Sequence, residues 1–171
     1  YRIEADLTYQ RCDGPYAVTN GPAISPDGRM LYHVDTHGGV VYAFDRNSDG
    51  ELENRRMFVT IDPSDGRPDG LTVDNEGCIW LAHWGGYRVT RFTPEGEVDG
   101  IVPIPAPQVT SCTFGGEDMS TLFITTAARN VDLQRYPHAG GLFCVNTTVT
   151  GNAVEPFKIS ESVSVFEVGV P

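Results

Sequence analysis

The 171-residue sequence lacks several features that would assign a function directly. No apolar run approaches the roughly 20 residues that a membrane-spanning helix requires. The sequence does not begin with a basic stretch followed by an apolar one, so no secretion signal is expected in it. Basic residues are also few, because 12 Lys and Arg stand against 23 Asp and Glu and give a net charge of −11. A surface this acidic repels phosphate backbones and anionic lipids, so we expect neither nucleic acid nor a membrane as a partner.

Closely spaced cysteine pairs are absent too. The four cysteines are far apart and none forms a Cys-x-x-Cys motif, which argues against a zinc ribbon and a thioredoxin-like redox site. They are Cys12, Cys78, Cys112 and Cys144. The last three lie in apolar, strand-like runs, so we expect buried free thiols in preference to disulfides. Free thiols favour a reducing compartment, and the expected location is cytoplasmic.

Helical periodicity is nearly absent, and short strand-like segments take its place. Gly-rich turn signals such as SPDG, THGG, NSDG, DNEG and TPEG separate these segments. Short strands at regular spacing with such turns are typical of an all-β sandwich, barrel or propeller. Only residues 132–136 are expected to make a helical turn. The expected strands are 21–25, 30–36, 40–45, 55–61, 70–74, 78–84, 87–93, 97–104, 109–115, 121–127 and 141–146.

An internal repeat decides among these all-β folds. The segment GPAISPDGRMLYHVDTHGGVVYAFD aligns with DGLTVDNEGCIWLAHWGGYRVTRFT, so that Gly28 matches Gly77 at a separation of 49 residues. A third copy, VTSCTFGGEDMSTLFITTA, continues after an insertion with GGLFCVN. A fourth strand follows each of the first two copies, and four-stranded repeats of this length indicate β-propeller blades.

The repeat predicts about three and a half blades of a β-propeller. The expected parts are the end of a preceding blade at 1–18, three blades at 19–66, 67–108 and 109–159, and a C-terminal tail at 160–171. The segment EPFKI, at 155–159, is the candidate fourth strand of the last blade. Propellers usually have four to eight blades. We therefore expect a ring that a second copy, another chain or residues outside this sequence complete.

Polar residues at the start of the inner strands form the candidate site. In a propeller each inner strand starts near the central channel at one face of the ring, so residues far apart in sequence converge there. These positions hold Asn20, Asp69 and, in the third copy, Ser111. The second strand of a blade returns to the same face, which brings His83 and Trp84 to the rim of the expected site.

Asn20 and Asp69 offer hard oxygen ligands. An amide oxygen and a carboxylate suit Ca²⁺, Mg²⁺, Mn²⁺ or a loosely held Zn²⁺ and leave positions for water and substrate. The alternative is that both residues cap turns beside glycine, which is how we interpret Asp74 at the head of a hairpin turn. No Gly-x-Ser-x-Gly elbow occurs and Ser111 has no evident His–Asp pair, so serine hydrolase chemistry is not expected.

The order of the motifs resembles the senescence-marker-protein/gluconolactonase/luciferin-regenerating-enzyme family. The resemblance rests on TNGPAISPDGRMLYHVDT, AFDRNSDGELENRRMFV, GRPDGLTVDNEGCIWLAHWGGYRVTRFTPEG, TSCTFGGEDMSTLFITTA and AGGLFCVN. It covers residues 1–159, which correspond to the C-terminal half or somewhat more of a six-bladed member. Within the family, the sequence is most similar to the bacterial sugar lactonases.

The resemblance implies metal-dependent hydrolysis of a sugar lactone to an aldonic acid. In that family one divalent cation is held by a Glu of the first blade, an Asn and an Asp. Asn20 matches the Asn, and Asp69 matches the Asp, which is also the candidate general base. His83, Trp84 and Ser111 are then expected to contact the lactone. The Glu has no counterpart here, and the alternative is a non-catalytic propeller piece that binds a partner or a second copy.

Overall fold

The computed structural model describes residues 1–154 and 156–160, which fall into two compact units. Tyr16–Ala153 forms the larger unit, and Tyr1–Pro15 forms the smaller one with the described residues that follow Ala153. Within the described residues, no helix is long and apolar enough to cross a membrane.

The smaller unit contains one short antiparallel ladder. Strand β1 (Arg2–Ile3) pairs with β2 (Tyr9–Gln10). The Ser160 amide donates to the carbonyl oxygen of Ala5 at 2.8 Å, which ties the end of the described chain to its beginning. The segment expected to end a preceding blade, 1–18, thus contains two strands, each only two residues long.

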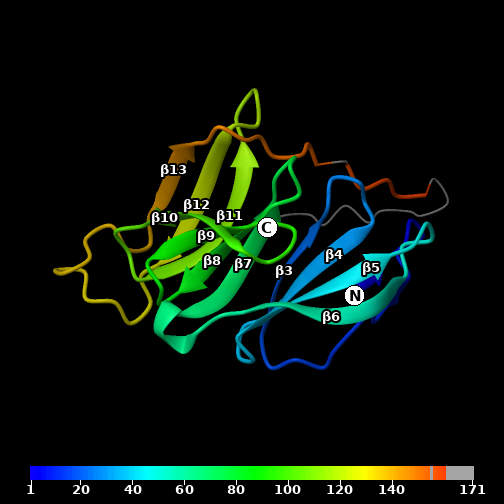
Figure 1. Cartoon of the computed structure of the whole chain (residues 1–171), viewed down its shortest axis with the longest axis horizontal. Helices are drawn as coiled ribbons and strands as arrows, with labels where there is room; N and C mark the ends of the chain where they lie inside the picture. The colour runs from blue at the N-terminus through cyan, green and yellow to red at the C-terminus, as the bar shows by residue number, and fades with distance from the viewer. Residues whose placement is uncertain (155, 161–171) are drawn as a thin grey trace, which may run out of the picture. The chain divides into compact units, whose positions relative to one another are not determined.

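The larger unit begins with a four-stranded antiparallel sheet in the order β3-β4-β5-β6 (Figure 1). Its strands are β3 (Thr19–Ile24), β4 (Met30–Asp35), β5 (Val40–Arg46) and β6 (Leu52–Thr60). The turn between β3 and β4 closes because the Asp27 carboxylate accepts from the Ser25 hydroxyl at 2.6 Å and from the Arg29 amide at 3.0 Å. Gly28 supplies the left-handed residue that this turn needs, with φ of 73°.

A second group of strands follows a short 3₁₀ turn, η1 (Pro63–Asp65). Its members are β7 (Arg67–Val73), β8 (Ile79–Trp84), β9 (Arg88–Phe92), β10 (Val98–Pro103), β11 (Gln108–Gly115), β12 (Thr121–Ala127) and β13 (Leu142–Asn146). Strands β7 to β10 are antiparallel neighbours in sequence order, as are β11 to β13. A single pair, Gln108 with Trp84, links β11 to β8.

The predicted all-β class is confirmed, and each of the eleven expected segments contains an observed strand. The largest differences lie at strand starts, because β6 begins at Leu52 and β7 at Arg67, three residues before the expected 55 and 70, and β3 begins at Thr19, two residues before 21. All three strands continue pairing past a β-bulge, which a pattern of alternating apolar residues does not reveal. Residues 132–136 make one hydrogen-bonded turn, in which the Tyr136 amide donates to the Asp132 carbonyl at 2.9 Å.

The candidate fourth strand of the last blade is wrong for residues 156–159, which carry no strand; Glu155 lies outside the described residues. After β13 the chain turns back to the β7–β8 hairpin, where Gly151 forms a bridge with Asp74. The Asn75 amide donates to the Thr150 carbonyl at 2.8 Å. These contacts draw the chain away from the free edge of β13.

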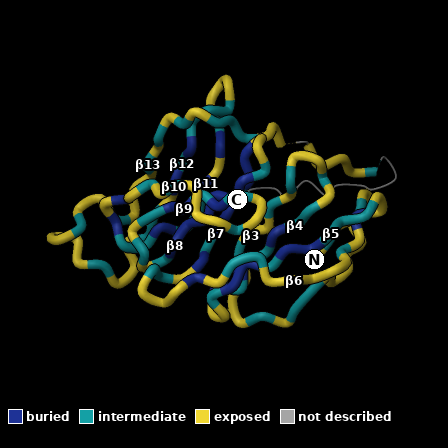
Figure 2. The backbone as a smooth tube through the Cα atoms, viewed as in Figure 1, coloured by how far each residue is buried: buried dark blue, intermediate teal, exposed yellow. Residues whose placement is uncertain are grey.

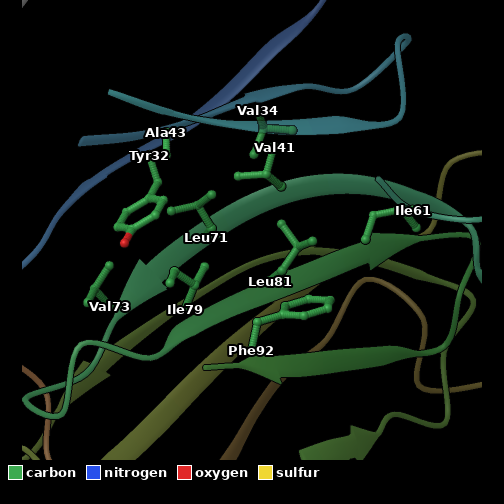
Figure 3. Packing of buried hydrophobic residues seen from close by; sticks show 10 residues of the cluster. All are labelled: Tyr32, Val34, Val41, Ala43, Ile61, Leu71, Val73, Ile79, Leu81 and Phe92. Atoms are coloured by element: carbon green, nitrogen blue, oxygen red, sulfur yellow. The ribbon is translucent and has the colours of Figure 1, made fainter. Parts of the chain in front are cut away.

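Strand β8 is buried over most of its length (Figure 2), and its residues belong to two hydrophobic clusters. Ile79 and Leu81 face a cluster that β8 shares with the first sheet, including Val34 and Val41 (Figure 3). The side chains between them, Trp80 and Ala82, pack into a second cluster with β11 and β12. This explains why the run IWLA is apolar throughout and does not alternate.

The cysteine prediction is partly wrong. All four cysteines are free, and Cys78 and Cys112 are buried as expected, but Cys144 is exposed. On the edge strand β13 its neighbours Phe143 and Val145 pack onto the second cluster, so Cys144 points to the other face. Burial raises the pKa of the Cys112 thiol to about 12, which leaves it unreactive at neutral pH.

We expect Leu81→Ala to lower the free energy of unfolding by about 3–5 kcal/mol, because Leu81 is fully buried and its removal leaves a cavity. Urea denaturation measures this change. The matched control is Leu142→Ala at a leucine that is 68% exposed, where we expect a change below about 0.5 kcal/mol. Equal effects of the two substitutions would contradict the assigned core.

Candidate functional site

The three inner strands β3, β7 and β11 approach one another at glycines. A Cβ atom added to Gly21 of β3 would lie 3.5 Å from Leu71 Cγ of β7. A Cβ atom added to Gly70 of β7 would lie 2.6 Å from the Ser111 Cβ of β11, closer than real Cβ contacts. The close approach of β11 therefore requires glycine at position 70. The segments of β3, β7 and β11 that carry the candidate residues lie side by side.

Each inner strand carries a β-bulge at the corresponding place. The register shifts by one residue between Asn20 and Ala23 in β3, between Pro68 and Leu71 in β7, and between Val109 and Ser111 in β11. A bulge places an extra residue in one strand and re-aims the side chains beside it, which is common next to active sites. The candidate residues Asn20, Asp69 and Ser111 thus lie at or within three equivalent bulges.

The Asn20 side chain has a defined orientation. It is half-buried, and its Nδ2 group donates a 2.8 Å hydrogen bond to the Thr36 hydroxyl. Thr36 is itself only 8% exposed, so this partner is held firmly. With Nδ2 engaged by Thr36, the amide oxygen Oδ1 is left to accept from, or ligate, another group.

Asp69 is a half-buried carboxylate without a cationic neighbour. No ion pair involves it within residues 1–154 and 156–160. Burial raises its pKa to about 6, and the hydrogen bond from the Gly70 amide offsets this only in part. A carboxylate held in this way is stabilised by an approaching cation, and perturbed carboxylates of this kind are common at functional sites.

Ser111, His83 and Trp84 occupy different positions around Asp69. Ser111 lies against Gly70, directly beside Asp69 in β7. His83 is fully buried, and its Nδ1 lies 3.0 Å from the Asp65 carbonyl oxygen. Trp84 is half-buried at the end of β8 and pairs with the first residues of β7 and β11. A contact of these three side chains with substrate remains a prediction.

His83 helps to hold the crossover from β6 to β7. Asp65 of that crossover also forms an ion pair with Arg88 at 2.8 Å. Gly66 and Gly86 pack without room for a side chain, since a Cβ atom on Gly66 would lie 2.6 Å from the Gly86 amide nitrogen. The segment that leads into Asp69 is therefore clamped onto the β8–β9 hairpin.

The described residues contain no group of three or more His, Cys, Asp or Glu side chains that could hold a metal ion. Asn20 Oδ1 and the Asp69 carboxylate are nevertheless hard oxygen donors on adjacent strands, a donor type that fits a cation such as Ca²⁺ or Mg²⁺. Further coordination positions would be filled by water, by substrate or by groups outside the described residues.

Asp74 is more than the turn residue that its sequence indicates. It is fully buried, and its carboxylate accepts from Trp80 Nε1 at 2.9 Å, Arg91 Nε at 2.8 Å and the Cys78 amide at 3.0 Å. Trp80 and Arg91 are cross-strand partners, so the network joins the hairpin to β8 and β9. A single sequence gives no signal for this, because the three residues meet only through strand register.

The chain is similar to known proteins over most of its length. The sequence profile of the SMP-30/Gluconolactonase/LRE-like region matches residues 1–128. L-arabinolactonase of Azospirillum brasilense is 37% identical over 161 residues, which cover 92% of this chain and 53% of that protein. The 6-deoxy-6-sulfogluconolactonase of Pseudomonas putida is 36% identical over 156 residues, 89% of this chain and 54% of that protein. Regucalcin of Agrobacterium tumefaciens, whose structure is described as that of a calcium-binding protein, matches with a TM-score of 0.79 at 28% identity, over 84% of this chain and 50% of that chain.

These matches define the class of protein as a β-propeller, in which β3 to β6 and β7 to β10 are each connected as four consecutive antiparallel strands. The chain belongs to the SMP-30/gluconolactonase/LRE-like family, so the family and the fold expected from the motifs are both confirmed. The chain spans about half the length of the curated relatives it matches.

We expect Asp74→Ala to lower the free energy of unfolding by about 3–5 kcal/mol, because it removes the acceptor of the Trp80 indole and the only fully buried partner of Arg91, which keeps Glu76 and Asp99 at the surface. Chemical denaturation measures the loss. Glu76→Ala is the matched control, since Glu76 pairs with the same arginine but is exposed. There we expect a loss below about 1 kcal/mol. A loss at Asp74 no larger than at Glu76 would show that the buried network is dispensable.

The burial of His83 predicts a pH dependence of stability. Burial lowers its pKa to about 4, below the 6.5 of an exposed histidine, so the unfolded chain takes up this proton first as pH falls. Stability should therefore be unaffected by His83 above about pH 6.5 and fall by about 3 kcal/mol between pH 6.5 and 4. Denaturation at several pH values measures the free energy of unfolding as a function of pH. The fall between pH 6.5 and 4 should be smaller in His83→Gln and unchanged in His37→Gln, a control at an exposed histidine. An unchanged slope in His83→Gln would contradict the assignment.

Proposed function

We propose that this chain carries the metal-binding part of an enzyme that hydrolyses sugar lactones to aldonic acids. The observation that carries the proposal is the placement of Asn20 and Asp69 at equivalent bulges of adjacent inner strands, with the Asn20 amide oriented by Thr36. Relatives named as lactonases of an aldose and of a sulfonated sugar support the reaction class. The calcium-binding description of a structural neighbour supports a divalent cation.

Asn20 Oδ1 and an Asp69 carboxylate oxygen would hold this cation, which is Ca²⁺, Zn²⁺, Mg²⁺ or Mn²⁺. When bound, a divalent cation polarises a lactone carbonyl and acidifies water. Because a cation depresses the pKa of a carboxylate that binds it, we assign Asp69 first as a ligand and second as the acceptor of the proton from the attacking water. Ring opening breaks the bond between the carbonyl carbon and the ring oxygen, and the proton passes to that oxygen, which becomes a hydroxyl group of the aldonic acid.

Ser111 and Trp84 are proposed to orient the lactone by contact, and the fully buried His83 by holding the crossover that leads into Asp69. Ser111 lies next to Gly70 and can donate its hydroxyl to a sugar oxygen. Trp84 and His83 lie at the end of β8 that faces the same site, where Trp84 can pack against the sugar ring. The remaining blades of the ring would come from further residues of the protein or from a second copy, and the proposed location is the cytoplasm.

We expect Asp69→Asn to weaken binding of Ca²⁺ or Mn²⁺ by about 100-fold, since it removes the only charged ligand that we assign. Isothermal titration at neutral pH measures the affinity, and a pH-stat assay on gluconolactone and arabinolactone measures hydrolysis. Chelation should abolish hydrolysis and added divalent cation should restore it.

The control is Glu95→Gln, which removes one negative charge at an exposed turn and should leave cation affinity within about twofold. Full lactonase activity in Asp69→Asn would overturn the proposal. A uniform loss of affinity in both variants would mean that only the net charge of −11 attracts the cation.

A further inference from the structure

Two equivalent hairpins differ at the residue that must adopt a left-handed conformation. The β4–β5 loop has four residues between the paired Asp35 and Val40. The β8–β9 loop likewise has four residues between the paired His83 and Arg88. In the first hairpin the last loop residue is Gly39, with φ of 70°, and in the second it is Tyr87, with φ of 58°. A bulky side chain is strained in this region, whereas glycine is not. A strained residue where glycine would fit is a reason to look for function.

The Tyr87 side chain is held at the surface by a second tyrosine. Its hydroxyl donates to the Tyr136 hydroxyl at 2.9 Å, and the two ring centroids lie 5.6 Å apart at an angle of 52°. Tyr87 remains 40% exposed. The Arg135 guanidinium lies 5.1 Å from the Tyr136 ring centroid. Two aromatic faces, a hydroxyl proton and a cation are therefore grouped at one exposed place.

The loop that presents Tyr136 is anchored at its base. This inserted loop, residues 128–141, joins β12 to β13 and is the yellow loop at the left of Figure 1. The Thr126 hydroxyl donates to the Gly141 carbonyl at 2.8 Å and accepts from the Gly140 amide at 3.0 Å. Ala139 packs against the second hydrophobic cluster. The loop that carries Tyr136 is thus anchored, and its contact with Tyr87 joins two different blades.

Both tyrosines lie at the end of the sheets that carries Asp69. Strand β7 starts at this end, β8 finishes there, and the loop after β12 follows on the same side. Tyr87 is two strands across from Asp69 and about two residues further along. With strands about 4.8 Å apart and a rise of about 3.3 Å per residue, the two Cα atoms are about 12 Å apart. A monosaccharide lactone and the two side chains can fill that span.

We propose that Tyr87, Tyr136 and Arg135 form a subsite for the hydroxylated tail of the sugar. The aromatic faces would stack on the C–H face of the sugar. The Tyr136 hydroxyl, which accepts from Tyr87, still has its own proton to donate to a sugar oxygen, and Arg135 adds further donors. These residues determine specificity and take no part in bond breaking. The choice of a sugar as ligand rests on the proposed function.

Binding of gluconate, the open-chain product, tests the subsite without requiring catalysis. By calorimetric titration we expect Tyr87→Gly to weaken gluconate binding at least tenfold, Tyr87→Phe about threefold, and neither to change Ca²⁺ affinity. Because glycine fits the backbone at this position, Tyr87→Gly should be no less stable than the parent chain. Equal gluconate affinity in the parent and Tyr87→Gly, or no binding by either, would overturn the subsite.

Hydrolysis separates this inference from the proposed function. For gluconolactone we expect Tyr87→Gly and Tyr136→Phe to raise KM with little change in kcat, whereas kcat/KM for unsubstituted γ-butyrolactone should change less than twofold. A merely structural role predicts equal losses on both lactones together with a lower Tm, which contradicts the subsite. Absence of any lactone hydrolysis by the parent chain would contradict the proposed function, and the gluconate titration would still decide the subsite.

Discussion

The inner strands β3, β7 and β11 approach one another closely, and this approach determines how the blades pack. Gly70 has no space for a side chain because Ser111 of β11 lies against it, and Gly21 lies beside Leu71 of β7. A β-bulge occurs in each of the three strands. The same geometry that lets the blades pack brings Asn20 and Asp69, 49 residues apart in sequence, to one end of adjacent strands.

Strand β8 connects the inner strands to the rest of the larger unit. Its side chains belong alternately to the two hydrophobic clusters, so it fixes the first sheet on one side and β11 with β12 on the other. At one end of β8 the Asp74 carboxylate binds Trp80 and Arg91, and at the other end His83 and Arg88 hold the crossover at Asp65. Both sets of contacts, at Asp74 and at Asp65, are directional hydrogen bonds and ion pairs between buried or partly buried groups. They therefore fix the register of β7, which carries Asp69.

Much of the fold follows from the sequence because alternating apolar residues and Gly-rich turns are local signals, and the repeat extends them to blades. The predicted fourth strand of the last blade is wrong because Thr150 and Gly151 instead contact the β7–β8 hairpin. These residues are far from the hairpin in sequence, so a local pattern does not reveal the contact. Cys144 was misplaced because an apolar run does not tell which face of an edge strand is covered. Within the candidate site, the sequence supplies the ligand types, but the orientation of Asn20 by Thr36 and the burial of His83 arise only on folding.

We propose that Asn20 and Asp69 bind one divalent cation together. Anomalous diffraction from crystals soaked in Mn²⁺ locates the ion independently of any assumed ligand. We expect one strong peak about 2.0–2.6 Å from both Asn20 Oδ1 and an Asp69 carboxylate oxygen, the range for hard cations and oxygen ligands. A peak bound to other residues, or no peak between these two side chains at saturating Mn²⁺, would contradict it.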